Sequence, residues 1–175
     1  MAAGHASLAD LFHSLGRLAE ARDGYEKSIA ISEALVREVP DETWYRSNLA
    51  SNLRRRGLVR RDLGDPAGAA CDTRKALLFF DELPKKSGEQ WYETACCHAA
   101  LAGLAQSPGT GVSAEAGPAE ADVASDLLRR AVGMGYCDRD TFCTETALDS
   151  IRNRPDFRLL MMDLAMPAQP FATAR

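Results

Sequence analysis

Hydrophobic positions recur along this chain with the spacing of one helical face. Small and apolar residues stand four, three and one positions apart in three segments. The first set is Gly16, Ala21, Tyr25, Ser28 and Ile29, the second is Gly64, Ala69, Thr73, Ala76 and Leu77, and the third is Ala124, Leu128, Ala131 and Val132. Another helical pattern precedes each set. The sequence therefore predicts three helix–turn–helix units, with small residues where neighbouring helices approach closely.

Turn residues separate the predicted helices. Gly16 follows the first helical pattern, and Pro40 follows the second. Asp41 and Asp65 are placed to cap the helices that come next, and Pro66 takes the first helical position after Asp65. No segment alternates apolar and polar residues as a half-buried strand would. The predicted fold class is all-α.

The predicted helical array covers residues 1–136. Its three pairs are expected at about residues 5–39, 41–83 and 89–135. Residues 106–119 are rich in Gly, Pro, Ser and Ala, so we expect a flexible loop inside the third pair. Short helices in residues 137–165 are expected to form a C-terminal cap over the apolar face of the last pair. Residues 166–175 are expected to form a flexible tail.

The first unit resembles a tetratricopeptide repeat. The consensus positions are occupied by Leu8, Ala9, Phe12, Gly16, Ala21, Tyr25 and Ser28. The resemblance implies an α-solenoid of about three helix–turn–helix pairs, in which the first helix of each pair lines a concave groove. The second unit departs from the consensus at Arg56, Arg60 and Thr73, where Leu and two aromatic residues are usual. The period is also longer than is usual for the family.

Three further segments resemble the C-terminal repeat region of planctomycete-type bacterial serine/threonine protein kinases. They are residues 44–50, 87–96 and 154–160. In those proteins a kinase domain precedes tandem repeats, so this resemblance implies a regulatory or scaffolding region whose catalytic domain is not in this chain. The Gly-rich phosphate loop, the V-A-I-K lysine and the D-F-G motif of a kinase are missing. Asp138-Arg139-Asp140 is interpreted as a polar turn.

Composition narrows the function classes. The 175 residues are 46% hydrophobic, which argues against wholesale disorder, and they carry a formal net charge of −4. This acidity removes the usual signature of a nucleic-acid binder. The longest run of low polarity, residues 94–105, is too short to span a bilayer, and no signal peptide opens the sequence. We expect a cytoplasmic protein that binds neither nucleic acid nor membrane.

Five cysteines and three histidines are the candidates for metal or catalytic chemistry. Cys96 and Cys97 point to different sides of a helix, and Cys137 and Cys143 lack C-x-x-C spacing, so no metal site is predicted. Cys97 and His98 are adjacent and form no dyad with each other. We expect no metal, no cofactor and no enzymatic activity. An enzyme that uses Cys96 or Cys97 is the remaining alternative.

The strongest candidate for binding is an arginine cluster in the third predicted helix. Five guanidiniums within eight residues belong to Arg54, Arg55, Arg56, Arg60 and Arg61. Their forked geometry suits carboxylate or phosphate groups. The alternative is a solvated helix face whose intramolecular salt bridges each contribute little. The candidate groove residues are Asn48, Ser51, Asn52, Arg54, Arg55, Leu58 and Arg61.

By the resemblance, these residues would face the concave groove. The sequence therefore predicts a non-catalytic protein–protein interaction module that binds a peptide or partner protein, with acidic or phosphorylated segments among the expected partners. The clamp that some family members use for a terminal carboxylate is not predicted, because Ala6, Ser7 and Asp10 occupy the corresponding stretch. The aromatic pairs Trp44-Tyr45 and Trp91-Tyr92 are expected to mark the core between repeats. The oligomeric state is left open.

Overall fold

The computed structural model describes residues 2–166, and within this range every regular element is a helix. The elements are α1 (Ala2–Ser14), α2 (Leu18–Glu38), α3 (Thr43–Asp62), α4 (Pro66–Asp81), α5 (Gly88–Leu104), α6 (Ala116–Gly133), α7 (Arg139–Thr144), the 3-10 helix η1 (Thr146–Ser150) and α8 (Pro155–Ala165). The all-α prediction is confirmed. Apart from Met166, the tail expected at residues 166–175 lies outside the described residues.

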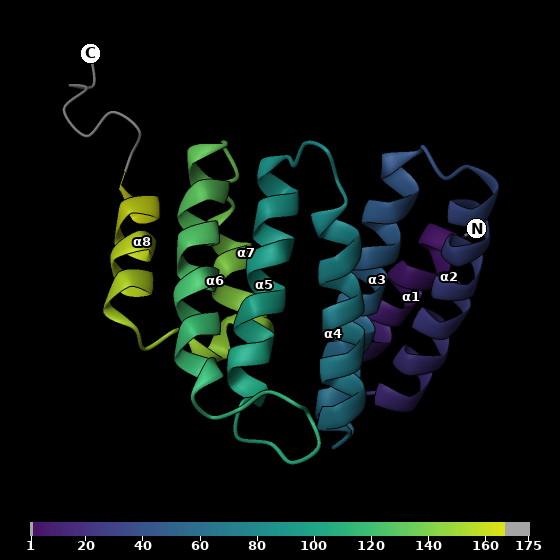
Figure 1. Cartoon of the computed structure of the whole chain (residues 1–175), viewed down its shortest axis with the longest axis horizontal. Helices are drawn as coiled ribbons and strands as arrows, with labels where there is room; N and C mark the ends of the chain where they lie inside the picture. Colours follow the sequence, from purple (N-terminus) through teal and green to yellow (C-terminus); the bar gives the residue numbers. More distant parts are fainter. Residues whose placement is uncertain (1, 167–175) are drawn as a thin grey trace.

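The six long helices pack as three successive pairs. α1 packs on α2, α3 on α4 and α5 on α6, while α2–α3 and α4–α5 contacts join neighbouring pairs. Figure 1 shows the three pairs side by side, with α1 and α2 at one end and α8 at the other. α6 begins at Ala116, so the last four residues of the loop expected at 106–119 belong to its first turn.

Glycine and capping residues set the turns inside the first two pairs. Gly16 and Gly64 have φ values of 72° and 80°, a left-handed backbone that residues with a Cβ rarely adopt. The Asp65 side chain accepts a hydrogen bond from the Gly68 N–H, and Pro66 occupies the first turn of α4. Local sequence therefore positions these helix ends without help from distant contacts.

The start of α3 differs from the sequence-based expectation. Asp41 does not cap this helix. Glu42 does, because the chain stays extended there (φ −81°, ψ 101°) and helical geometry begins only at Thr43. The Glu42 carboxylate accepts a hydrogen bond from the Trp44 N–H at 3.1 Å. Asp41 is one residue too early to reach the free N–H groups of the first turn.

Two main apolar clusters hold the pairs together. The first joins α1–α5. Its largest members include Tyr25, Leu49, Leu53, Val59 and Phe80. The second joins α5 and α6 to the C-terminal helices, and includes Tyr92, Leu128, Phe142, Leu148, Ile151 and Phe157. The short C-terminal helices thus cover the apolar face of the third pair.

The recurring aromatic pairs occupy different environments. Tyr92 is buried, with its ring centroid 4.8 Å from that of Tyr136 and 5.0 Å from that of Phe142. Trp91 is partly buried beneath the Arg130 guanidinium. Trp44 is 60% exposed, so the expectation that all four aromatics mark the core is wrong for this residue. Tyr136 and Phe142 follow the third pair and pack against the start of α5, and no described segment does the same for Trp44.

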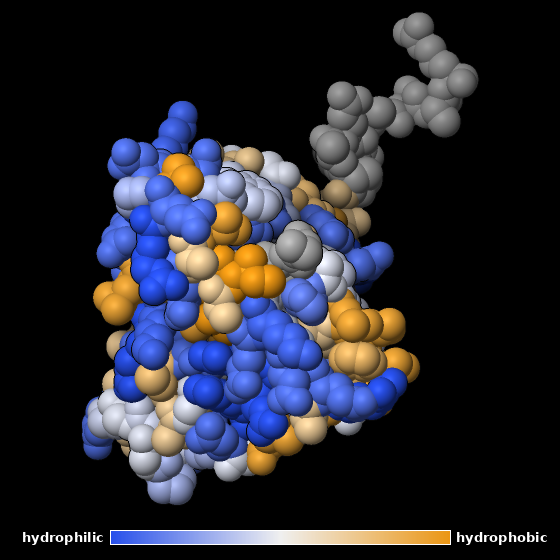
Figure 2. Space-filling model, turned by 90° about the vertical axis from the view of Figure 1, so that its right-hand side faces the viewer, coloured by the Kyte–Doolittle hydropathy of each residue, from blue (hydrophilic) through white to orange (hydrophobic). Residues whose placement is uncertain are grey.

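The opposite end of the array leaves apolar side chains exposed. Figure 2 looks onto the end formed by α1 and α2, where orange apolar groups lie in patches among blue polar ones. On α1, Leu8, Leu11 and Leu15 are 47%, 52% and 61% exposed. Within residues 2–166 no further helix pair packs on this outer face, which leaves its apolar side chains exposed.

Replacing Ala76 by Arg should destabilise the protein by more than about 3 kcal/mol, because the site combines full burial with no room for a long charged side chain. Ala76 is 0% exposed in the first apolar cluster. Leu78 lies on the same helix and is 65% exposed, so Leu78→Arg should change stability by less than about 0.5 kcal/mol. Urea unfolding followed by circular dichroism measures both variants. Equal stabilities would mean that the packing of α4 is not as described.

Candidate functional site

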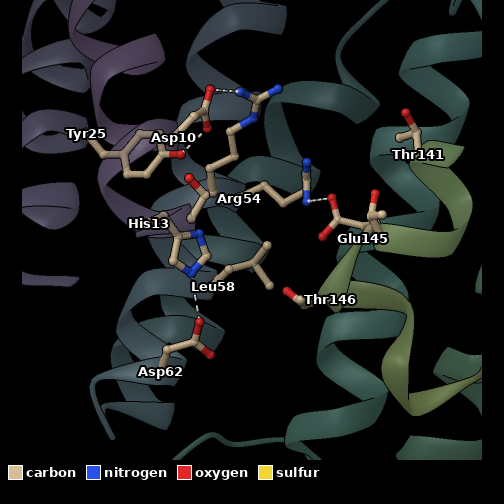
Figure 3. Close-up of a pocket in the computed structure, with 12 residues that line it drawn as sticks. Asp10, His13, Tyr25, Arg54, Leu58, Asp62, Thr141, Glu145 and Thr146 are labelled. Carbon is tan, nitrogen blue, oxygen red and sulfur yellow. Dashed lines mark hydrogen bonds and ion pairs between the residues drawn. The ribbon is translucent and has the colours of Figure 1, made fainter. Parts of the chain in front are cut away.

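A pocket of about 620 Å³ lies between α3 and the C-terminal helices; we call it the central pocket. Its lining residues are Asp10, His13 and Ser14 of α1, Tyr25 of α2, Arg54, Arg55, Leu58 and Asp62 of α3, Thr141 and Thr144 of α7, and Glu145 and Thr146 at the start of η1. Figure 3 shows the side chains of α1 and α3 on one side and those of α7 and η1 on the other. Segments far apart in the sequence therefore build one cavity.

Arg54 forms the buried base of the central pocket. It is 2% exposed. Its Nε donates to Glu93 Oε2 at 2.5 Å, and its Nη1 donates to Glu145 Oε2 at 3.0 Å (Figure 3 shows the second bond). Glu93 belongs to α5, and Glu145 caps η1. One guanidinium thus links the second helix pair, the third pair and the C-terminal helices; we call these three residues the ion triad.

Electrostatic attraction keeps Arg54 and Glu145 charged despite their burial. Burial by itself would raise the pKa of Glu145, but attraction to Arg54 and a hydrogen bond from the Ala147 N–H outweigh it and hold that pKa below its usual range. Burial would likewise lower the pKa of Arg54, whereas Glu145 and Glu93 raise it well above its usual value. Arg54 and Glu145 are therefore both ionised at neutral pH, and each depends on the other.

The α1 side of the pocket carries a second set of paired groups. The Tyr25 hydroxyl donates to Asp10, and Arg55 Nη1 donates to the other Asp10 oxygen at 2.6 Å. Burial and the neighbouring Asp10 carboxylate raise the pKa of Tyr25. His13 Nε2 lies 2.8 Å from Asp62 Oδ2 (Figure 3). The polar wall is thus organised by the protein itself before any ligand arrives.

Only part of the predicted groove set lies together at the central pocket. Arg54, Arg55 and Leu58 line it. Arg61 lies beside Thr146, donating to its carbonyl oxygen and its hydroxyl, each at 3.2 Å. Because Arg54 is buried and already bonded to two carboxylates, it offers a ligand far less than an exposed groove arginine would.

The remaining predicted residues lie elsewhere on α3. Asn48 and Ser51 line a smaller pocket of about 190 Å³ at the starts of α3 and α5. Trp44, Ser47, Glu89, Gln90 and Glu93 complete this pocket. Asn52 is 7% exposed, and its amide donates to Ser28 Oγ at 2.9 Å. Asn52 therefore joins α3 to α2 and does not face a ligand.

The other two arginines of the cluster bind a single buried carboxylate. Arg56 Nε lies 2.7 Å from Asp72 Oδ2, and Arg60 Nη1 lies 3.2 Å from the same oxygen. The Asp72 side chain is 1% exposed. All five guanidiniums thus have partners within the protein. The intramolecular interpretation of the cluster matches this geometry, although several of its pairs are buried and not solvated.

Sequence reasoning missed the carboxylates that complete this network. Glu145 stands 91 residues from Arg54, and no local pattern connects them. A signal did exist for Asp72. Apolar periodicity predicts a core position at Arg56, and a guanidinium at a core position requires a buried acid nearby.

Other chemistry-bearing groups offer little reactivity. Cys96 and Cys97 are both buried, and burial raises the pKa of each thiol, which makes them poor nucleophiles. Within residues 2–166, no group of three or more His, Cys, Asp or Glu side chains is arranged to hold a metal ion. Over the same residues, no helix combines the length and apolar character needed to cross a membrane.

Replacing Arg54 by Met should destabilise the fold by about 3–5 kcal/mol at neutral pH, because Glu93 and Glu145 would stay buried without their cation. The loss should depend on pH. In the wild type, the lowered pKa of Glu145 stabilises the fold above the unfolded value of about 4.3, and this contribution disappears as pH falls through the folded pKa. In the variant the pKa of Glu145 should rise, so stability should fall as pH increases above about 4.3.

Urea unfolding of both proteins between about pH 4 and pH 7 checks this sign, since the difference in unfolding free energy should widen with pH. Arg55→Met is the matched control. Its pair with Asp10 is partly exposed, so the loss should stay below about 1 kcal/mol. A pH-independent penalty for Arg54→Met would contradict an electrostatic role for the ion triad.

Comparison of the chain with family models, curated proteins and solved structures found no match. Its function is therefore inferred from the geometry and chemistry of its own side chains.

Proposed function

We propose that this chain is a non-catalytic protein-interaction module of the tetratricopeptide type, which binds a segment of a partner protein along the face formed by α1, α3 and α5. The observation that carries the proposal is the central pocket. Its walls come from α1, α3, α7 and η1, and its polar groups are already held in place by hydrogen bonds and ion pairs. A preorganised cavity of this kind loses little conformational entropy when a ligand binds.

The two pockets on α3 support a continuous binding face. α3 lines both the central pocket and the smaller Trp44 pocket, and the second of these also contacts α5. Glu93 lines the smaller pocket and binds Arg54, which lines the central one. The first helices of the three pairs thus supply most of the lining, as the repeat resemblance implies for a groove.

The charges of this face favour a partner different from the one that the arginine cluster suggests. The central pocket is lined by Asp10, Asp62 and Glu145 against Arg54 and Arg55. The smaller pocket adds Glu89 and Glu93. With the guanidiniums already paired, the proposal keeps a peptide or protein partner but favours segments that present hydrogen-bond donors or a cation over acidic or phosphorylated ones.

His13, Asp62 and Ser14 in the central pocket are residue types found in catalytic triads, but their geometry does not favour catalysis. His13 pairs with Asp62, and Ser14 is its sequence neighbour. The Ser14 hydroxyl, however, donates to the Leu11 carbonyl at 2.8 Å. Adjacent residues of a helix also point about 100° apart, so His13 is not placed to take the proton of this hydroxyl.

Filling the central pocket should weaken binding strongly without damage to the fold. Thr144 is an exposed pocket residue whose hydroxyl bonds only within its own helix, so Thr144→Trp introduces bulk at the cavity. Peptides selected on the immobilised chain from a displayed random library provide the probe. Their affinity, measured by fluorescence anisotropy, should fall at least about tenfold in Thr144→Trp, or about 1.4 kcal/mol.

Lys75→Trp is the matched control, since Lys75 is exposed on α4 and lines neither pocket of the proposed face. Both variants should keep the wild-type melting temperature within a few degrees. Selected peptides that bind Thr144→Trp as tightly as the wild type, or a selection that enriches no peptide, would refute the proposal.

A further inference from the structure

A third recess lies at the C-terminal end of the molecule, away from the proposed binding face. It has a volume of about 420 Å³ and lies between α7 and α8; we call it the cap groove. Phe157 and Met161 provide a largely buried apolar floor, while Met162 is 61% exposed at its wall. Cys143 contributes from α7. This recess shares no lining residue with the central pocket.

The apolar surface continues beyond the cap groove along α8. Leu159, Met162 and Met166 are 59%, 61% and 64% exposed. Leu159 and Met162 stand three residues apart on α8 and so lie on one helical face, while Met166 follows directly after the helix in extended backbone. Met162 belongs to both the groove and this strip of Leu159, Met162 and Met166. Methionine side chains are flexible and polarisable, which lets such a surface adapt to the shape of an apolar partner.

Arginines without an acidic partner border the cap groove. Arginines 139, 152 and 158 line it, and no carboxylate does. Arg152 is occupied by Asp149 and two carbonyl oxygens. Arg139 and Arg158 are exposed, and within residues 2–166 neither guanidinium has an acidic partner; Arg158 has only a 3.3 Å hydrogen bond to the Asn153 amide oxygen.

Several arginines elsewhere in the chain are instead paired with acids. The guanidiniums of Arg54, Arg56 and Arg154, among others, are bound to carboxylates. In a chain of net charge −4, two free cations beside an apolar recess form a local positive rim. An apolar floor with a cationic rim is complementary to an apolar anchor flanked by carboxylates.

We propose that the cap groove docks an acidic amphipathic helix of a partner protein. Apolar side chains of that helix enter the groove and lie along the strip on α8, and carboxylates beside them pair with Arg139 and Arg158. In this helix-in-groove mode the docking helix supplies apolar anchors at i, i+3 or i+4, and i+7, and the groove receives them.

A helix of a protein fits this surface better than a lipid bilayer does. α8 carries Asp156 and Asp163 besides its single arginine, whereas a helix that lies on an anionic membrane has a strongly basic polar face. The site is also recessed, which suits the insertion of side chains. Binding to anionic vesicles is therefore an outcome that would overturn the proposal.

The test uses the full chain and a fluorescein-labelled synthetic helix with Leu at i, i+3, i+4 and i+7 and Glu at the flanking positions. Fluorescence anisotropy should show saturable binding, and a scrambled peptide of the same composition should bind at least about tenfold more weakly. Arg139→Glu combined with Arg158→Glu should weaken binding at least about tenfold. Arg139→Lys with Arg158→Lys should restore most of it, because the charge is kept.

Arg22→Glu combined with Arg37→Glu on α2 is the matched control, because it changes net charge equally at a distant surface. It should leave the affinity within about twofold. Met162→Glu should weaken binding as the arginine reversals do, with all variants melting as the wild type. Thr144→Trp should bind the acidic helix normally, which separates this proposal from the function of the central pocket.

Three results would overturn the proposal. The first is equal binding of the designed and scrambled peptides. The second is an affinity that survives both the arginine reversals and Met162→Glu. The third is competition for the same surface by phosphatidylserine vesicles or by a second copy of this chain, seen as vesicle co-sedimentation or as a concentration-dependent mass in light scattering.

Discussion

The buried ion triad of Arg54, Glu93 and Glu145 is the interaction on which the arrangement of this protein depends. It joins α3, α5 and η1 through one guanidinium, at a point where Arg54 and Glu93 are buried and Glu145 is largely so. An unpaired charge at this depth would cost several kcal/mol, so each member holds the other two in position. The start of η1 is thereby fixed opposite α3, and the central pocket is the space left between them.

The arginine cluster of α3 is neutralised by carboxylates of the protein itself, so its role is structural. A run of guanidiniums in a sequence suggests a surface prepared for anions, but Arg56 and Arg60 share Asp72, and Arg55 binds Asp10. The cluster ties α3 to its neighbours. Arg139 and Arg158 at the cap groove, by contrast, have no acidic partner among residues 2–166, and no carboxylate lines that groove.

Local interactions explain how much of the fold was predictable. The helix pairs follow from apolar spacing and from turn residues such as Gly16, Asp65 and Pro66, whose effects act within one helical turn. The cap of α3 is Glu42 and not the predicted Asp41. The spacing of apolar residues does not reveal at which of two neighbouring residues a helix begins, so the sequence could not distinguish these two caps. The candidate site was predictable in part, since Arg54, Arg55 and Leu58 do line the same pocket.

The sequence by itself determined the all-helical class and the existence of a charged stripe on α3, because both depend on residues three and four positions apart. Only the tertiary structure decided what that stripe does. Asp10, Asp72, Glu93 and Glu145 reach it from four other elements, and their separation along the chain carries no periodic signal. A guanidinium looks the same in a sequence whether it faces water or a buried acid. The physical difference between these environments is the cost of desolvation, which exists only once the helices have packed.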